Sequence, residues 1–324
     1  MNRRQMLFAA SAISAAPMLY AQTGRVAQVG ILATAHAPTS EEWARSPFRL
    51  KLSELGWVEG RNLKIERRNT ASASELPRAA RELAALKLDV IYATGAPSLR
   101  AAKQEITTTP IVMFTVGDPV ASGWVKNLAR PEGNITGVAG FSRDLAGKRV
   151  ALLKEILPAI KNVAVLGNPA NARLADIFQD LQGRARASGV EVRLFEVASP
   201  AVLEPTFAAI AREPIQGLTD IPDPMTFDQR KRIVELAASN RLPAIYESSA
   251  FAEAGGLITY GPDYEELSRR AAVYVDKILR GAKPGNLPVE FPTKFEMVVN
   301  LKTARALGIT VPQTVLLRAD RVID

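Results

Sequence analysis

The strongest constraint on the fold is an alternation of short apolar runs with helical segments along most of the chain. Apolar runs such as 26–33, 89–93 and 110–115 each end at a polar or proline-containing turn. Segments with helical spacing of Ala, Leu and charged residues, such as 74–86, lie between these runs. Strands and helices joined over such short connections predict a parallel sheet covered by helices on both faces. We therefore expect an α/β fold of the doubly wound, Rossmann-like kind.

The same alternation restarts after about residue 145. Strand-like runs recur over 162–166, 191–195, 217–219 and 244–246, with helical segments between them. A third set begins at 257–260, continues as a helix over 264–280 and ends in a proline-spaced tail whose last strand we expect at 315–319. Since 324 residues suit about two domains, the chain is expected to form two doubly wound units of similar size, each with a parallel central sheet.

The residue content excludes several kinds of catalytic site. The chain has no cysteine and one histidine, His36, so disulfides, thiolate zinc sites, iron–sulfur clusters and sites with two His ligands are excluded. A Ser-His-Asp triad would have to use His36, and no G-x-S-x-G motif accompanies it. Phosphate-loop and G-x-G-x-x-G dinucleotide motifs are also missing. We expect no cofactor, no metal and no enzyme activity; a secreted enzyme that uses an Asp pair stays open as an alternative.

The formal net charge of +8 does not indicate a nucleic-acid partner. Part of the charge, Arg3 and Arg4, lies in the N-terminal segment, and the other basic residues are scattered among acids. No block of five or six basic residues occurs, and the aromatic residues are not interleaved with basic ones. We expect no nucleic-acid binding.

Residues 1–21 have the organisation of an export signal. A basic start with Arg3 and Arg4 precedes an apolar stretch that contains Pro17 and ends in small residues. The stretch is shorter than the roughly 20 residues that span a bilayer, although an uncleaved anchor stays open. We expect removal of the signal near Ala21/Gln22 and a soluble periplasmic protein, exported by either the general or the twin-arginine route.

Candidate binding residues lie where the expected strands end. In open parallel sheets, ligands bind outside the carboxyl ends of the strands. The segment 94–98 combines hydroxyl groups with a helix N-terminus that suits a carboxylate. Asp118 or Asp220 could accept from an ammonium or hydroxyl group of the ligand, and Tyr246 could cover the ligand's side chain. The purely structural alternatives are a helix cap at 94–98, ordinary turns at the aspartates and a core position for Tyr246. The full set of ligand-binding candidates is Thr34, His36, Thr94, Gly95, Ala96, Ser98, Gly117, Asp118, Asn168, Asp220 and Tyr246. This chemistry favours a small carboxylate, either an amino acid or an aromatic acid.

Several short motifs together resemble one family. They are Gly56-Trp57-Val58-Glu59-Gly60-Arg61-Asn62-Leu63, Gly117-Asp118-Pro119-Val120, Gly133-Asn134-Ile135-Thr136-Gly137, Ala254-Gly255-Gly256-Leu257 and the tail from Leu287 to Ala304. In these motifs the chain is similar to the ABC transporter substrate-binding proteins with the type I periplasmic-binding-protein fold, in the branch related to tryptophan- and tyrosine-binding proteins.

The resemblance implies two lobes that are joined by three hinge crossings and close on a small ligand. The expected lobes are 26–142 with 252–285, and 143–251 with 286–324, with crossings near 141–145, 248–253 and 283–288. The resemblance also implies a monomer that delivers its ligand to the permease of an ABC importer in the inner membrane. A ligand-sensing protein on the same fold is the remaining alternative.

Overall fold

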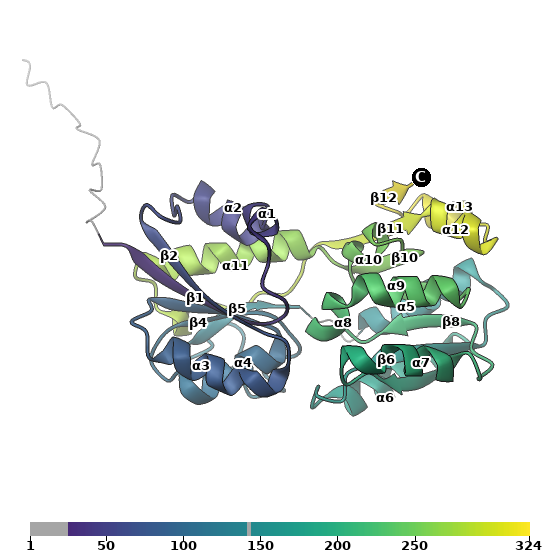
Figure 1. Cartoon of the computed structure of the whole chain (residues 1–324), viewed down its shortest axis with the longest axis horizontal. Helices are drawn as coiled ribbons and strands as arrows, with labels where there is room; N and C mark the ends of the chain where they lie inside the picture. The colour runs from purple at the N-terminus through teal and green to yellow at the C-terminus, as the bar shows by residue number, and fades with distance from the viewer. Residues whose placement is uncertain (1–24, 141–143) are drawn as a thin grey trace, which may run out of the picture.

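The computed structural model describes residues 25–140 and 144–324, which form two lobes side by side along the long axis (Figure 1). The first lobe contains a five-stranded parallel sheet in the order β2-β1-β3-β4-β5. Its strands are β1 (Ala27–Thr34), β2 (Leu63–Thr70), β3 (Val90–Thr94), β4 (Ile111–Val116) and β5 (Ile135–Ala139). Its helices are α1 (Ser40–Ala44), α2 (Pro47–Glu54), α3 (Leu76–Ala84), α4 (Gly95–Glu105) and α11 (Tyr264–Leu279), with 3-10 turns η1 (Ala73–Glu75) and η3 (Pro284–Asn286).

The second lobe contains a seven-stranded sheet in the order β12-β11-β10-β9-β8-β6-β7. All of its pairings are parallel except that of β10 with β11. Its strands are β6 (Asn162–Gly167), β7 (Glu191–Glu196), β8 (Gly217–Asp220), β9 (Ala244–Tyr246), β10 (Ile258–Pro262), β11 (Phe295–Asn300) and β12 (Arg321–Ile323). Its helices are α5 (Asp144–Ile156), α6 (Leu174–Ala187), α7 (Leu203–Ile210), α8 (Pro224–Asp228), α9 (Arg230–Ser239), α10 (Ser249–Glu253), α12 (Leu301–Leu307) and α13 (Gln313–Leu316), with η2 (Pro200–Val202).

Each sheet is covered on both faces, as near-continuous apolar strands require. In the first lobe, α3 and α4 pack on one face and α2 and α11 on the other. In the second lobe, α5, α6, α12 and α13 share one core, while α7, α9 and α10 share the opposite one. The expected α/β class with two doubly wound units is confirmed, with one antiparallel pairing in the second sheet.

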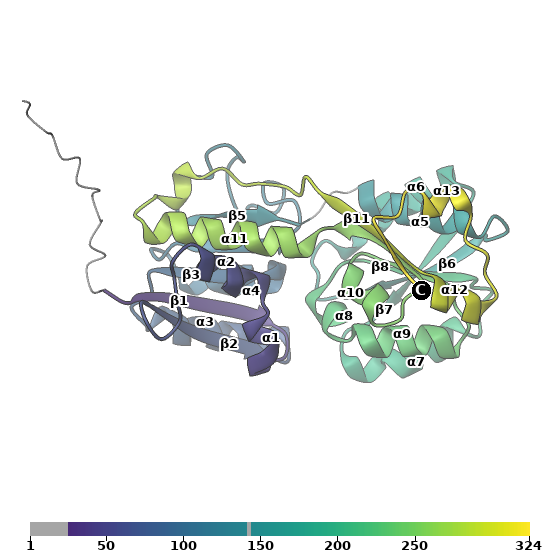
Figure 2. The ribbon, with the colours of Figure 1, turned by 90° about the horizontal axis from the view of Figure 1, so that it is seen from above.

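Two of the chain crossings between the lobes lie side by side between α11 and β11, as Figure 2 shows. One runs from β10 into α11 through Asp263, and the other enters β11 near Lys294. The two segments are joined because Lys294 Nζ donates to Asp263 Oδ2 at 2.7 Å and the Asp263 amide donates to the Lys294 carbonyl at 3.1 Å. The expected first crossing near 141–145 falls on residues 141–143, which lie outside the described residues.

The expected second crossing near 248–253 is wrong, and with it part of the expected lobe boundary. Strand β10 pairs with β9 through Thr259↔Tyr246 and with β11 through Thr259↔Val298, so it belongs to the second sheet. The helix α10 packs on the same strands. The chain therefore returns to the first lobe only after Pro262, and residues 252–262 belong to the second lobe rather than the first. The expected third crossing near 283–288 is wrong as well, because Val289 packs in the core of the first lobe and Glu290 bridges to Val138 of β5, so residues 286–291 belong to the first lobe.

The expected strand at 315–319 is also wrong. Residues Gln313–Leu316 form the helix α13, and the strand β12 follows at Arg321–Ile323. The helix follows Pro312, packs on α5 and buries Val315 in the core of the second lobe. Asp320 then aligns β12, since its backbone and side chain both bond to the backbone of Met297.

The expected signal peptide over 1–21 lies outside the described residues. Among the helices of residues 25–140 and 144–324, none combines the length and apolar character needed to cross a bilayer.

Candidate functional site

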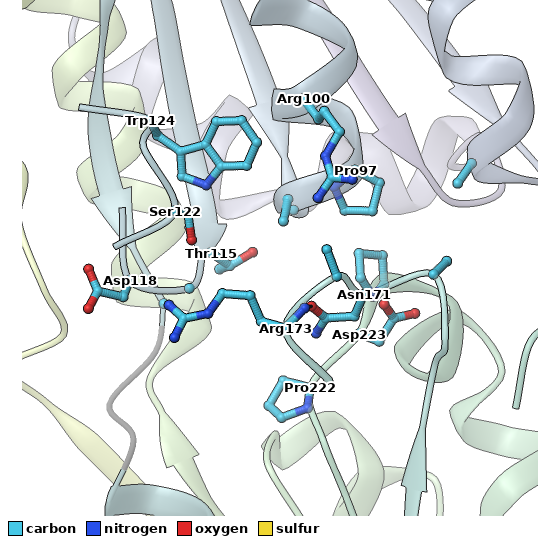
Figure 3. Close-up of a pocket in the computed structure, with 18 of the residues that line it drawn as sticks. Pro97, Arg100, Thr115, Asp118, Ser122, Trp124, Asn171, Arg173, Pro222 and Asp223 are labelled. Carbon is cyan, nitrogen blue, oxygen red and sulfur yellow. Dashed lines mark hydrogen bonds between the residues drawn. The ribbon is translucent and has the colours of Figure 1, made fainter. Parts of the chain in front are cut away.

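A cleft of about 950 Å³ lies between the lobes, and both contribute to its wall (Figure 3). Its position agrees with the rule that ligands bind where strands end and loops gather. From the first lobe the wall takes the N-terminal part of α4 and the segment that follows β4. From the second lobe it takes the loop between β6 and α6, the first turns of α6, and the loop between β8 and α8.

The N-terminus of α4 opens into the cleft. Gly95 and Ala96 line the wall, and Thr94, the residue before the helix, makes no side-chain cap. The first amides of α4 are therefore left for another acceptor, and the positive end of the helix dipole adds to their attraction for an anion. Pro97, the third residue of the helix, has no N–H and presents its ring instead.

A backbone irregularity in β4 points Thr115 into the cleft. The register between β4 and β5 shifts between Phe114 and Val116, and Thr115 has a φ of 53°. Such bulges redirect a side chain out of the ladder, and in Figure 3 the Thr115 hydroxyl faces the cavity. Gly140 makes the geometry possible, because a Cβ there would lie 2.6 Å from the Thr115 Cα.

The aromatic wall of the cleft is Trp124, which follows the turn after β4. Lys103 of α4 lies over the Trp124 ring at 5.6 Å and donates to the Gly123 carbonyl at 2.6 Å, so it ties the turn to the helix. Tyr264, at the start of α11, lines the wall near the crossing into the first lobe. These groups supply the apolar surface that ligand sites in proteins use beside a few polar contacts.

The second lobe places Asn171, Arg173 and Asp223 in the wall. Arg173 stretches along the floor of the cleft beneath Thr115 (Figure 3). Asp223 caps α8 by accepting from the Met225 amide at 2.9 Å, and it also accepts from Asn168 Nδ2 at 2.9 Å. Burial raises the pKa of the Asp223 carboxyl, against the lowering effect of these donors.

The structure brings four of the eleven sequence candidates into the wall. They are Gly95, Ala96, Gly117 and Asp118. The Asp118 carboxylate accepts from the amides of Val120 and Ala121, at 3.1 and 2.9 Å, and in Figure 3 it points away from the centre of the cavity.

The other seven candidates do not line the wall. Thr34 is buried at the end of β1, and the Thr94 hydroxyl donates to the Leu32 carbonyl at 3.5 Å. Ser98 lies in the first turn of α4 and is fully buried. Asn168 acts on the site indirectly by holding Asp223. His36 instead reaches the other lobe, where its Nδ1 lies 2.6 Å from Asp228 Oδ2.

Asp220 and Tyr246 are core residues, so their expected contacts with the ligand are corrected. Tyr246 is fully buried and stacks on Phe251 with 4.5 Å between ring centroids. Its ring therefore packs against a core residue and not against a ligand. Asp220 is 1% exposed and lies near the buried Arg149 and Glu247. Burial raises the pKa of Asp220 to about 6, while Arg149 opposes the rise.

The sequence interpretation missed the wall residues Arg100, Trp124, Arg173 and Tyr264, and it did not single out Thr115 as a binding residue. Arg100 could have been found from helical spacing, since residues three and four apart share a helix face and Arg100 follows Ala96 by four. The bulge that presents Thr115 has no sequence signal of its own. Among the described residues, no group of three or more His, Asp or Glu side chains is arranged to hold a metal ion.

Comparison with known proteins gives a consistent result over nearly the whole described chain. The family described as ABC transporter substrate binding protein matches residues 28–323. A tyrosine-binding protein of Clostridioides difficile is 26% identical over 282 residues, which cover 87% of this chain and 81% of that protein. An ABC domain from Streptococcus pneumoniae, solved in complex with L-Trp, has a TM-score of 0.83 and 25% identity, with 92% of this chain and 99% of that chain covered. A ligand-free, open substrate-binding protein from Clostridium difficile is 26% identical with the same coverage, at a TM-score of 0.64.

The TM-score is 0.83 with the L-Trp complex and 0.64 with the open, ligand-free structure, at nearly equal identity and coverage. In this chain the two lobes meet across the cleft, because a Cβ on Gly95 of the first lobe would lie 2.7 Å from Pro224 Cγ of the second. The lobes of this structure are therefore close together.

Proposed function

Because this chain belongs to the family of ABC transporter substrate-binding proteins, we propose that it captures a small carboxylate, an amino acid or an aromatic acid, in the cleft between its lobes. The observation that carries the proposal is the uncapped N-terminus of α4 beside the Thr115 hydroxyl in the cleft wall. Backbone amides at a helix N-terminus and a hydroxyl are a donor set suited to a carboxylate.

The remaining wall suits the body of such a ligand. Trp124 offers a ring for stacking against an aromatic or aliphatic side chain. Arg173, from the second lobe, approaches the same space, so a bound anion would attract both lobes and favour closure. The tyrosine-binding and L-Trp-bound relatives support a ligand with a carboxylate and an aromatic ring.

The cellular role follows from the family. We propose that the chain is exported by the signal expected over 1–21, works as a monomer in the periplasm, and delivers its ligand to the permease of an ABC importer. The family is one of solute-binding proteins, and we propose that this member binds without turnover.

Calorimetry with amino acids, aromatic acids, neutral sugars and polyamines tests the proposed ligand class. We expect saturable binding of a carboxylate and none of a sugar or a polyamine. Replacing Thr115 with alanine removes one donor and should weaken carboxylate binding by about 1–3 kcal/mol, since the lost hydrogen bond is to a charged oxygen.

Ser98→Ala is the matched control for Thr115→Ala. Ser98→Ala also removes one hydroxyl group, but Ser98 is fully buried and does not line the cleft. The Ser98→Ala variant should therefore bind the carboxylate with nearly the affinity of the unaltered protein. Tight binding of a neutral sugar or a polycation, with no response to acids, would refute the proposed function.

The exposed pair between His36 and Asp228 predicts a small contribution to closure. It joins the loop after β1 in the first lobe to α8 in the second, with 2.6 Å between Nδ1 and Oδ2. Because exposed pairs contribute about 0–1 kcal/mol, His36→Gln should weaken ligand binding by no more than about fivefold. A double-mutant cycle with Asp228→Asn, measured by calorimetry, should show that the two effects are not additive; fully additive effects would mean that the pair does not couple the lobes.

A further inference from the structure

All but one of the charged side chains in the cleft wall have a hydrogen-bond or ion-pair partner among the described residues. Lys103 donates to the Gly123 carbonyl, Arg173 lies 3.8 Å from Asp176, and Asp180 accepts from Arg184 at 2.8 Å. The exception is Arg100, whose guanidinium makes no hydrogen bond, ion pair or ring contact with any residue in 25–140 or 144–324.

The carboxylates of the wall are likewise in use. Asp118 accepts from two backbone amides at the turn after β4. Asp223 accepts from Asn168 Nδ2 and from the Met225 amide, both through Oδ1. Asp176 and Asp180 pair with arginines. An incoming ammonium group would have to share its acceptor with these partners, whereas an anion meets a guanidinium that has none.

Arg100 lies close to the anion-binding end of α4. It is exposed to the cleft, five residues after Gly95, and side chains of a helix lean toward its N-terminus. In Figure 3 its guanidinium lies beside Pro97 and points into the cavity. At this end of the helix Pro97 supplies no N–H, so the guanidinium adds donors where the backbone lacks one.

We propose that Arg100 is the specificity-determining cation of the cleft, and that the natural ligand is an organic acid of net negative charge without an α-ammonium group. The proposal rests on the proposed function and selects one of its two ligand classes. An unpaired cation in a closing cleft is costly unless the ligand neutralises it. The carboxylate of such a ligand neutralises Arg100. Because the ligand has no ammonium group, it needs no aspartate of the cleft wall as an acceptor.

Pairs of ligands that differ only in the ammonium group give a direct test. L-Tryptophan is compared with indole-3-propionate, and L-tyrosine with 3-(4-hydroxyphenyl)propionate, by calorimetry on the full mature chain. We expect the acid of each pair to bind at least about tenfold more tightly than the amino acid, since a charge-assisted hydrogen bond is worth that much. Equal or tighter binding of the amino acids would overturn the proposal.

Substitution of Arg100 supplies the second arm. Arg100→Gln should weaken binding of the two acids at least about tenfold and reduce their preference over the amino acids, while Arg100→Lys should retain part of it. Arg212→Gln is the matched control, because the Arg212 guanidinium is also exposed and without a partner among the described residues, but lies outside the cleft wall. An Arg100→Gln variant with unchanged preference would overturn the proposal, whereas failure of every carboxylate to bind the unaltered protein would overturn the proposed function itself.

Discussion

Replacing Gly95 with alanine is expected to weaken ligand binding by about 10- to 100-fold while leaving the two lobes folded. A Cβ at this position would lie 2.7 Å from Pro224 Cγ of the facing lobe. The proline ring begins α8 and cannot move aside as a flexible side chain would. The lobes would have to stay further apart, and overpacking of this kind costs about 1–3 kcal/mol in the closed state.

A matched glycine separates this contact from backbone strain. Gly95 has a φ of 77° and Gly60 a φ of 83°, so alanine is strained at both positions, but a Cβ on Gly60 meets no atom within 4 Å. Gly60→Ala should therefore lose some stability and retain its affinity. Small-angle scattering should show compaction of the unaltered protein on binding and less compaction of Gly95→Ala; equal compaction and affinity would show that the Gly95–Pro224 contact does not limit closure.

The second large effect is expected from the buried charge cluster of Arg149, Asp220 and Glu247 beneath the cleft. Arg149 is 1% exposed and its Nη2 donates to the Asp220 carbonyl at 3.0 Å. Burial raises the pKa of Asp220 to about 6 and that of Glu247 well above its usual value, and Arg149 opposes both rises. Arg149 therefore offsets part of the free-energy cost of burying the carboxylates of Asp220 and Glu247.

Arg149→Met should lower the free energy of unfolding by about 3–5 kcal/mol at pH 8, because it leaves buried carboxylates without their cation. An acid whose pKa is raised by folding contributes stability that is present below its unfolded pKa and lost as pH rises through its folded pKa. In the unaltered protein, the contribution of Asp220 should therefore make the free energy of unfolding fall as pH rises from about 4 to about 6 and stay lower above that range. The loss caused by Arg149→Met should be smaller at pH 5, where the carboxyls take up protons, and urea unfolding at the two pH values measures it.

Asp220→Asn should act in the opposite direction. It removes one buried carboxylate and should raise the free energy of unfolding at pH 8 by about 2–3 kcal/mol, the equivalent of its pKa shift. The double variant Arg149→Met/Asp220→Asn should recover part of the loss of Arg149→Met. A stability of Arg149→Met that equals that of the unaltered protein at pH 8 would contradict this account of the cluster.

The sequence was sufficient to predict the α/β class, because the apolar strands and helical segments are local patterns. The runs 89–93 and 110–115 correspond to the strands β3 (Val90–Thr94) and β4 (Ile111–Val116) of the structure. A strand with apolar side chains on both faces needs a layer of helices on each side, so the pattern already implies the parallel, covered sheet.

The sequence also located part of the candidate site. Gly95 and Ala96 begin a helix directly after a strand, and Gly117 and Asp118 follow the next strand. Their place at the carboxyl edge of one sheet follows from chain order alone. The sequence pattern does not distinguish a polar residue that faces a cleft from one that faces a core, and so Ser98 and Asp220 were assigned wrongly to the cleft wall.

Only the tertiary structure decided to which lobe β10 belongs and which side chains meet across the cleft. The pairing of β10 with β9 and β11 joins residues up to 41 positions apart, such as Ile258 and Val299, and no local pattern encodes such partners. Thr115, Arg100 and Arg173 come together for the same reason, since a bulge, a helix face and the approach of the second lobe place them. Local chemistry determines which elements form, and long-range packing determines which of their side chains share a site.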